Sequence, residues 1–165
     1  MLTMTERAAL VEQYADGMAK LTAALATVPA AALRWRPAPS EWSAHEIIIH
    51  CADSETNSAG RIRYLLAERD VQIIGDDQAA WAVLFDFHAL PLEPALATIE
   101  AVRANTVPLL ERLDEAAWAR TGQHSESGRY SAEDWLQIYA EHLDLHAAQI
   151  EQNVSAWRSQ TAALS

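Results

Sequence analysis

Long stretches of helical hydrophobic periodicity constrain the fold of this chain more than any other feature of its sequence. In the first stretch, residues 3–28, the apolar positions recur at steps of three and four and are Leu10, Tyr14, Met18, Leu21, Leu25 and Val28. This spacing puts them on one face of a helix that can pack against other helices. Similar stripes follow in residues 43–69, 91–113 and 131–157. Because Gly and Pro are few and clustered, the stripes predict an all-α protein with four long helices.

Two of the expected helices begin with a capping signal. Ser43 is followed three residues later by Glu46, and Ser131 is followed by Asp134. In such a pair the two side chains satisfy backbone N–H groups that the first turn of a helix leaves unpaired. Helices are therefore expected to start at Ser43 and Ser131, and the second of them to run to about Trp157.

The connections between these helices carry weaker signals. Residues 70–92 contain a turn signal around Gly75, and a short helix is expected over residues 79–87. Residues 114–130 are polar and lack an apolar period, so a long polar loop is expected there. A chain of 165 residues is short enough for a single domain covering residues 1–165.

Charge and cysteine content exclude several classes of function. The formal net charge is −11, from 23 acidic and 12 basic residues, so the surface repels a phosphate backbone and nucleic-acid binding is not expected. A single cysteine, Cys51, cannot form an internal disulfide. The start of the chain lacks a secretory signal pattern, and no apolar run approaches the roughly 20 residues of a membrane-spanning helix. We therefore expect a cytoplasmic protein that binds no membrane.

Three of the six histidines stand where they could share one metal ion. His142 and His146 are four residues apart in an expected helix, which puts both imidazoles on one face. His50 lies in the apolar run I-I-I-H-C-A of another helix and therefore faces the core or a cavity. Zinc bonds histidine nitrogen at about 2.0–2.1 Å, so the three rings could hold one ion if the two helices meet. From spacing alone, hydrogen-bonded core histidines are an equally good interpretation.

Two segments resemble the signatures of a known family. Trp42–Glu55, W-S-A-H-E-I-I-I-H-C-A-D-S-E, is similar to the W-S-x-x-E-x-x-x-H-L-x-D-x-E signature of the DinB-like superfamily. Tyr139–Ile150, Y-A-E-H-L-D-L-H-A-A-Q-I, is similar to its H-x-x-x-H-x-x-Q-I signature. The resemblance implies an up-down-down-up four-helix bundle with a long crossover connection. It also implies a divalent metal ion, usually zinc or nickel, bound by His50, His142 and His146.

The resemblance further implies a metal-dependent enzyme that acts on a small molecule, and two chemistries are open. The first is a thiol-dependent S-transferase, in which the ion activates a low-molecular-weight thiol such as mycothiol or bacillithiol. The second is a hydrolase, in which the ion activates water. A hydrolase needs a general base, and the candidates are Glu46, one turn before His50, and Asp53, three residues after it. Both carboxylates have simpler roles available, Glu46 in the helix cap and Asp53 in orienting a histidine or pairing with an arginine.

A third possibility is a bundle without catalytic activity, in which the metal ion is structural. Such a site requires a fourth protein ligand, for which His88 and His124 are the candidates. Cys51 stands where the family commonly has leucine, and we expect a buried thiol that fills the core and is not a ligand.

Two further expectations concern partners. Arg61 and Arg63 could meet a substrate carboxylate at the mouth of the site, although pairing with surface acids is the simpler role for an arginine. A homodimer is common in the family, and exposed alanine-rich faces on the first helix could support one.

Overall fold

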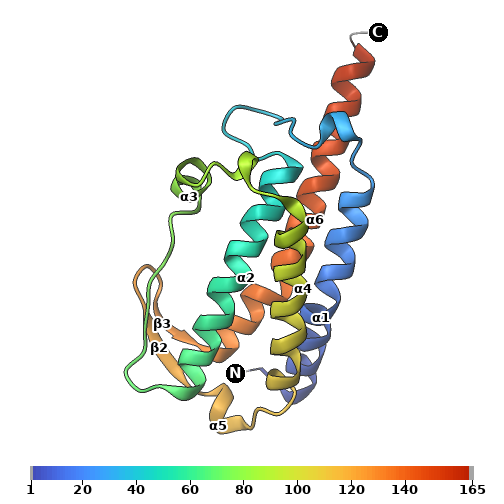
Figure 1. The fold of residues 1–165 in the computed structure, drawn as a ribbon. Coiled ribbons are helices and arrows are strands. Elements are labelled where there is room, and N and C mark those ends of the chain that lie inside the picture. Colours follow the sequence, from blue (N-terminus) through green and yellow to red (C-terminus); the bar gives the residue numbers. More distant parts are fainter. Residues whose placement is uncertain (1, 164–165) are drawn as a thin grey trace.

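Four long helices, packed side by side, form the body of the molecule (Figure 1). The computed structural model describes residues 2–163. The long helices are α1 (Met4–Ala26), α2 (Ala44–Ala67), α4 (Leu92–Leu110) and α6 (Ala132–Ala163). α1 and α6 run in one direction and α2 and α4 in the other, with a long crossover between α2 and α4 (Figure 1). The predicted helical bundle with up-down-down-up topology is confirmed.

The capping pairs expected from the sequence form at the starts of α2 and α6. The backbone N–H of Ser43 donates to the Glu46 carboxylate at 3.0 Å, and the N–H of Glu46 donates back to the Ser43 hydroxyl at 3.3 Å. Ser131 and Asp134 form the same reciprocal pair at 2.8 and 3.1 Å. These bonds satisfy first-turn N–H groups, so they set where each helix begins.

The end of α6 lies beyond its predicted position. The helix continues to Ala163, whereas the apolar stripe suggested an end near Trp157. The segment 132–163 contains no Gly or Pro and is rich in alanine, so nothing in its backbone stops the helix when the core contacts end. In Figure 1 this last part of α6 extends past the rest of the bundle.

Two clusters of buried side chains fill the space between the helices. Near the start of α2, the fully buried members include Leu21, Ile47, Ile48, Ile99, Leu143 and Ile150. Toward the other end, they are Tyr14, Ile62, Leu65, Trp135 and Leu136. Full burial of an aliphatic side chain contributes about 1.5–3 kcal/mol, so these contacts give the bundle a firm frame for a site on its inner faces.

The crossover between α2 and α4 has local structure of its own. It contains the short strand β1 (Gln72–Ile73), the short helix α3 (Gln78–Leu84) and the single turn η2 (Phe87–Ala89). The short helix predicted over residues 79–87 is therefore present, but it ends earlier, and a separate turn follows it. The buried ring of Phe87 anchors this turn in the core beside α2.

The prediction of a long polar loop over residues 114–130 is wrong. That segment forms the single-turn helix α5 (Glu115–Trp118) and a hairpin of β2 (Thr121–His124) and β3 (Gly128–Ser131). β1 joins the hairpin in parallel, with Gln72 opposite Gln123. Strands this short give no readable alternation of apolar and polar residues, so local sequence did not reveal the hairpin. The second partner of β2, β1, lies about fifty residues earlier in the chain.

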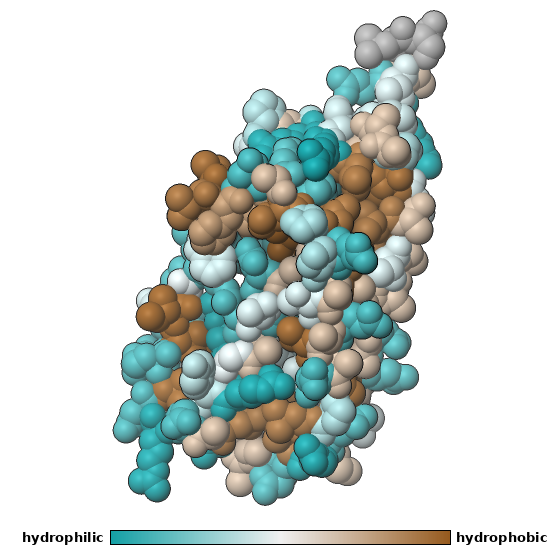
Figure 2. All heavy atoms as spheres, in the orientation of Figure 1, coloured by the Kyte–Doolittle hydropathy of each residue, from teal (hydrophilic) through white to brown (hydrophobic). Residues whose placement is uncertain are grey.

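The surface is mixed in polarity, and one of its apolar areas lies over the crossover, at the upper left of Figure 2. Val83, Leu84 and Phe85 at the end of α3 are 82%, 76% and 47% exposed. Within residues 2–163, none of the helices combines the length and the apolar character that crossing a membrane requires.

Substitutions at two glycines, one in β2 and one in α2, test how closely the hairpin packs against α2. A Cβ at Gly122 in β2 would lie 2.8 Å from the carbonyl oxygen of Val71 and 3.1 Å from Leu65, whereas a Cβ at Gly60 in α2 meets only Tyr64 at 3.7 Å. Gly122→Ala should therefore lower the free energy of unfolding by about 1–3 kcal/mol through overpacking. Gly60→Ala should raise it by about 0.4–1 kcal/mol, because alanine loses less backbone entropy in a helix.

Urea unfolding followed by circular dichroism measures both changes. Equal effects of the two substitutions, or a stabilising Gly122→Ala, would contradict the close packing of β2 against β1 and α2.

Candidate metal centre

Helices α2 and α6 bring three histidines together in the half of the bundle where α2 begins. His50 projects from the buried face of α2, and His142 and His146 project from successive turns of α6. The ring centroids are 5.5 Å apart for His50 and His142, 4.8 Å for His50 and His146, and 4.6 Å for His142 and His146. One nitrogen from each ring lies within 4.8 Å of the other two. The convergence that spacing alone left open is thus present in the structure.

The hydrogen bonds around the rings fit a metal-binding role. Nδ1 of His146 lies 2.9 Å from the side-chain oxygen of Gln149, an acceptor, which assigns the proton to Nδ1 and leaves the lone pair on Nε2. Nδ1 of His142 is buried and has no hydrogen-bond partner. A nitrogen that binds a divalent ion must carry its lone pair, and the Nε2 of His146 meets this requirement.

Burial keeps two of the rings neutral. Loss of solvent, together with the neighbouring His146 and His142, lowers the pKa of His50 to about 2. Loss of solvent and the neighbouring His142 lower the pKa of His146 to about 4. Both rings are therefore unprotonated at neutral pH, which is the form that binds metal. The indole of Trp42 lies 4.7 Å from the ring of His50 and shields it on one side.

Glu55 is a residue of this site that the sequence interpretation left without a role. Its carboxylate is fully buried, and Oε1 lies 3.8 Å from Nδ1 of His142. Burial opposes its ionisation, but the contacts with His142 and Arg103 outweigh it and lower the pKa of Glu55. The only signal in the sequence was its place as the last residue of the Trp42–Glu55 motif, on a face of α2 that is otherwise apolar or small.

The Glu46 carboxylate is bound by groups at the start of α2 and not by the three histidines. Its carboxylate accepts from the Ser43 N–H and from Nε of Arg36 at 2.8 Å, and Nε2 of His88 lies 3.2 Å from it. Burial raises its pKa, but Arg36 and Ser43 outweigh that effect and hold the pKa at about 2. The simpler role foreseen for Glu46, in the helix cap, accounts for these contacts.

Asp53 has the electrostatic character of a proton acceptor. It is partly buried on α2, three residues after His50. Its burial and, to a smaller extent, the negative charge of the nearby Asp76 raise its pKa. A carboxylate with a raised pKa holds a proton more strongly than an ordinary aspartate does. Of the two carboxylates proposed from the sequence, Asp53 is thus the better candidate for a base.

The other candidate ligands lie elsewhere. Nε2 of His88 lies 2.8 Å from the Ser43 hydroxyl, and Nδ1 of His124 accepts from the Glu126 N–H at 3.2 Å. Cys51 is fully buried and is not part of the histidine group. Within residues 2–163 the group therefore has three members and no fourth protein donor, which is the arrangement of an open site and not of a closed structural one.

Tyr139 and Arg61 extend the polar surroundings of the histidines toward the crossover. The ring of Tyr139 lies 5.8 Å from that of His142, and its hydroxyl accepts from Nη1 of Arg61 at 2.9 Å. Nη2 of Arg61 donates to Asp76 at 2.6 Å. Arg61 and Asp76 line a hollow of about 410 Å³ beside the crossover. A contact between Arg61 and a substrate stays a prediction, and its guanidinium is already paired.

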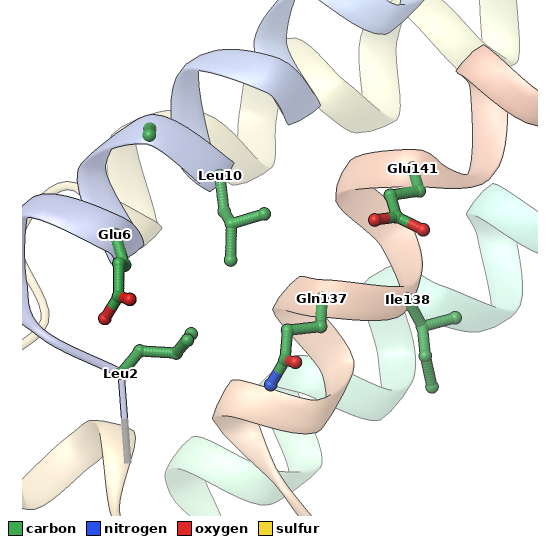
Figure 3. Close-up of a pocket in the computed structure, with 7 residues that line it drawn as sticks. Leu2, Glu6, Leu10, Gln137, Ile138 and Glu141 are labelled. Carbon is green, nitrogen blue, oxygen red and sulfur yellow. The ribbon is translucent and has the colours of Figure 1, made fainter.

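A separate hollow of about 560 Å³ lies between the start of α1 and α6 (Figure 3). The side chains of Leu2 and Leu10 point into the gap between the two helices, and Glu6, Gln137 and Glu141 contribute polar groups (Figure 3). Its lining contains no histidine or cysteine, so it offers no converging metal donors. The three histidines remain the candidate site.

This chain belongs to the DinB superfamily, whose sequence model matches residues 13–150. A protein of Oceanobacillus iheyensis named "Putative metal-dependent hydrolase" is 36% identical over 109 residues, which is 66% of this chain and 63% of that protein. A protein of Halalkalibacterium halodurans with the same description is 27% identical over 113 residues, or 68% of this chain and 66% of its own length. The matches thus span less than two thirds of these relatives.

A solved structure shows the same fold. YfiT from Bacillus subtilis, described as "a probable metal-dependent hydrolase with an unusual four-helix bundle topology", matches with a TM-score of 0.85. The match covers 93% of this chain and 88% of YfiT at 23% sequence identity. The predicted family and bundle topology are therefore both confirmed.

The cap carboxylate Glu46 makes a pH-dependent contribution to stability. Its pKa in the folded protein, about 2, lies below the ordinary value of 4.5, so its stabilising contribution is present above about pH 4.5 and is lost as the pH falls toward 2. Glu46→Gln should lower the free energy of unfolding at pH 7 and weaken its dependence on pH between 5 and 2. Urea unfolding at several pH values measures this dependence. Glu151→Gln, on an exposed face of α6, is the control; equal slopes for the two variants would refute the assignment.

Proposed function

We propose that this protein is a metal-dependent hydrolase whose divalent ion is bound by His50, His142 and His146. The observation that carries the proposal is the convergence of three largely buried imidazoles with no fourth protein donor among residues 2–163. Relatives at 27–36% identity are named as metal-dependent hydrolases, which supports this activity over others.

The residues around the triad have distinct tasks in this proposal. A divalent ion bound there would supply Lewis-acid polarisation of the substrate and an activated nucleophile at neutral pH. The lone pairs of His50 and His146 are available because burial keeps both rings neutral. Asp53 accepts a proton from the attacking water, since burial and Asp76 raise its pKa above that of an ordinary aspartate. Trp42 packs against the ring of His50 and limits its contact with solvent on that side.

Zinc and nickel are the ions we propose, since imidazole suits both metals. The substrate is a small molecule, and the hollow beside Arg61 and Asp76 is a candidate for part of its binding site. The alternative activity, transfer of a low-molecular-weight thiol, uses the same open triad. The names of the relatives favour hydrolysis, so the thiol reaction is the competitor to be tested beside it.

Removal of the imidazole of His50 or of His142 should abolish stoichiometric metal binding. Protein purified without a histidine tag should bind close to one equivalent of zinc or nickel, while His50→Ala and His142→Ala should lose most of it, since two imidazoles hold an ion far less firmly than three. Elemental analysis and calorimetric titration measure the occupancy. His124→Ala, in the hairpin, is the matched control and should bind as the wild type does. Full occupancy in both triad variants would show that the ion is not bound by these residues.

Asp53→Asn should reduce turnover without removing the metal. Loss of a general base typically lowers kcat by about 10²–10⁴-fold. The wild-type activity should fall as the pH drops, because protonated Asp53 cannot accept a proton, and this acid limb should be absent from the residual activity of the variant.

A panel of esters, amides and phosphoesters, assayed with and without bacillithiol, mycothiol or glutathione, tests hydrolysis and thiol transfer in parallel. Metal-dependent turnover only in the presence of a thiol would replace hydrolysis with S-transfer.

A further inference from the structure

A buried ion pair lies next to the triad at the centre of the bundle. Glu55 from α2 is 0% exposed and Arg103 from α4 is 2% exposed, and they are joined by an Nη2–Oε1 hydrogen bond of 2.6 Å. Replacing a buried ion pair by well-packed apolar residues often leaves a protein as stable or makes it more so. Stability is therefore a weak explanation for this pair, and its neighbours indicate another role.

The Glu55 carboxylate is held in place from several helices. Besides the bond from Arg103, Oε2 accepts from the Tyr14 hydroxyl of α1 at 3.2 Å. Arg103 itself donates to the carbonyl oxygens of Tyr14 and of Tyr139 in α6, the latter at 3.0 Å. A Cβ at Gly17 in α1 would come within 2.5 Å of Nη1 of Arg103, so the glycine leaves the space that the guanidinium occupies.

The group that this carboxylate faces is a ring nitrogen of the triad. Nδ1 of His142 is buried and unpartnered, and Oε1 of Glu55 lies 3.8 Å from it. A shift of less than about 1 Å would bring the two atoms to the distance of a hydrogen bond. His146 has the corresponding arrangement already, with its Nδ1 at 2.9 Å from Gln149. Both α6 histidines therefore direct Nδ1 toward an oxygen acceptor, which leaves Nε2 as the nitrogen available to a ligand.

We propose that Glu55 is a positioning residue for the metal centre. It accepts the Nδ1–H of His142, selects the tautomer with its lone pair on Nε2 and fixes the orientation of the ring, while Arg103 and Tyr14 hold the carboxylate. The inference rests on the proposed metal centre and extends it to a residue that binds no metal. Carboxylate partners of this kind commonly raise the metal affinity of a histidine site by about 10–100-fold.

Two variants separate positioning from stability. Glu55→Gln keeps a weaker acceptor of the same shape, and the double variant Glu55→Leu/Arg103→Met removes the acceptor without leaving a buried charge unpaired. Zinc affinity, measured by competition with a chromophoric chelator, should fall about tenfold in the first and about 10–100-fold in the second, with one ion still bound. The absorption spectrum of cobalt bound in place of zinc should change in both, because the orientation of one ligand has changed.

A second paired carboxylate of α2 provides the control. Glu46, nine residues before Glu55, is also buried and is paired with Arg36, but it faces the helix cap. Glu46→Leu/Arg36→Met should leave zinc affinity and the cobalt spectrum unchanged, whatever its effect on unfolding.

Nitrogen NMR of the histidine rings gives a readout on the metal-free protein. His142 should be the Nδ1–H tautomer in the wild type and a mixture of tautomers in Glu55→Leu/Arg103→Met. Unchanged affinity and tautomer in the double variant, while the wild type binds zinc, would overturn the role of Glu55 alone. Reduced affinity in both double variants, in proportion to their loss of stability, would also overturn it. A wild type that binds no zinc, nickel or cobalt would overturn the metal centre itself and the role of Glu55 with it.

Discussion

The buried contact between Glu55 and Arg103 is the interaction at which all four long helices of the bundle meet. A charge pair without access to water requires several partners, because each unsatisfied polar group in the interior costs about 1–3 kcal/mol. Here those partners come from all four long helices: Tyr14 from α1, Glu55 from α2, Arg103 from α4 and the Tyr139 carbonyl from α6. Sliding one helix along another would break these bonds, so the pair favours one register among the registers that apolar packing alone would allow.

The same register sets the geometry of the triad. His50 is five residues before Glu55 on α2, and His142 is three residues after Tyr139 on α6. Fixing α2 against α6 at Glu55 and Tyr139 therefore also fixes how closely the two helices bring their histidines. Burial at this depth removes solvent from the rings and lowers the pKa of His50 and of His146, so the packing that assembles the group also keeps it in the neutral form.

YfiT has the same fold although most of its sequence differs. The bundle superposes on YfiT with a TM-score of 0.85 although only 23% of the residues are identical. A bundle tolerates such change because its core needs apolar volume at helical spacing more than it needs particular residues. The crossover and the hairpin β2–β3 cover one side of α2, where exposed apolar residues of α3 and the hollow beside Arg61 lie. Variation in these segments can alter what reaches the site without disturbing the four helices.

The sequence by itself determined the long helices, their capped starts at Ser43 and Ser131, the bundle topology through the family motifs, and the one-turn spacing of His142 and His146. These features depend on backbone geometry within a few residues, which local side chains encode. Only the tertiary structure decided that the rings of His50, His142 and His146 converge, which spacing alone left open, and that Glu55 faces His142. It also decided that β1 adds to the β2–β3 hairpin, since Gln72 pairs with Gln123 about fifty residues later in the chain. Such contacts follow from how the helices pack and how the crossover closes, and no local pattern in the sequence records that.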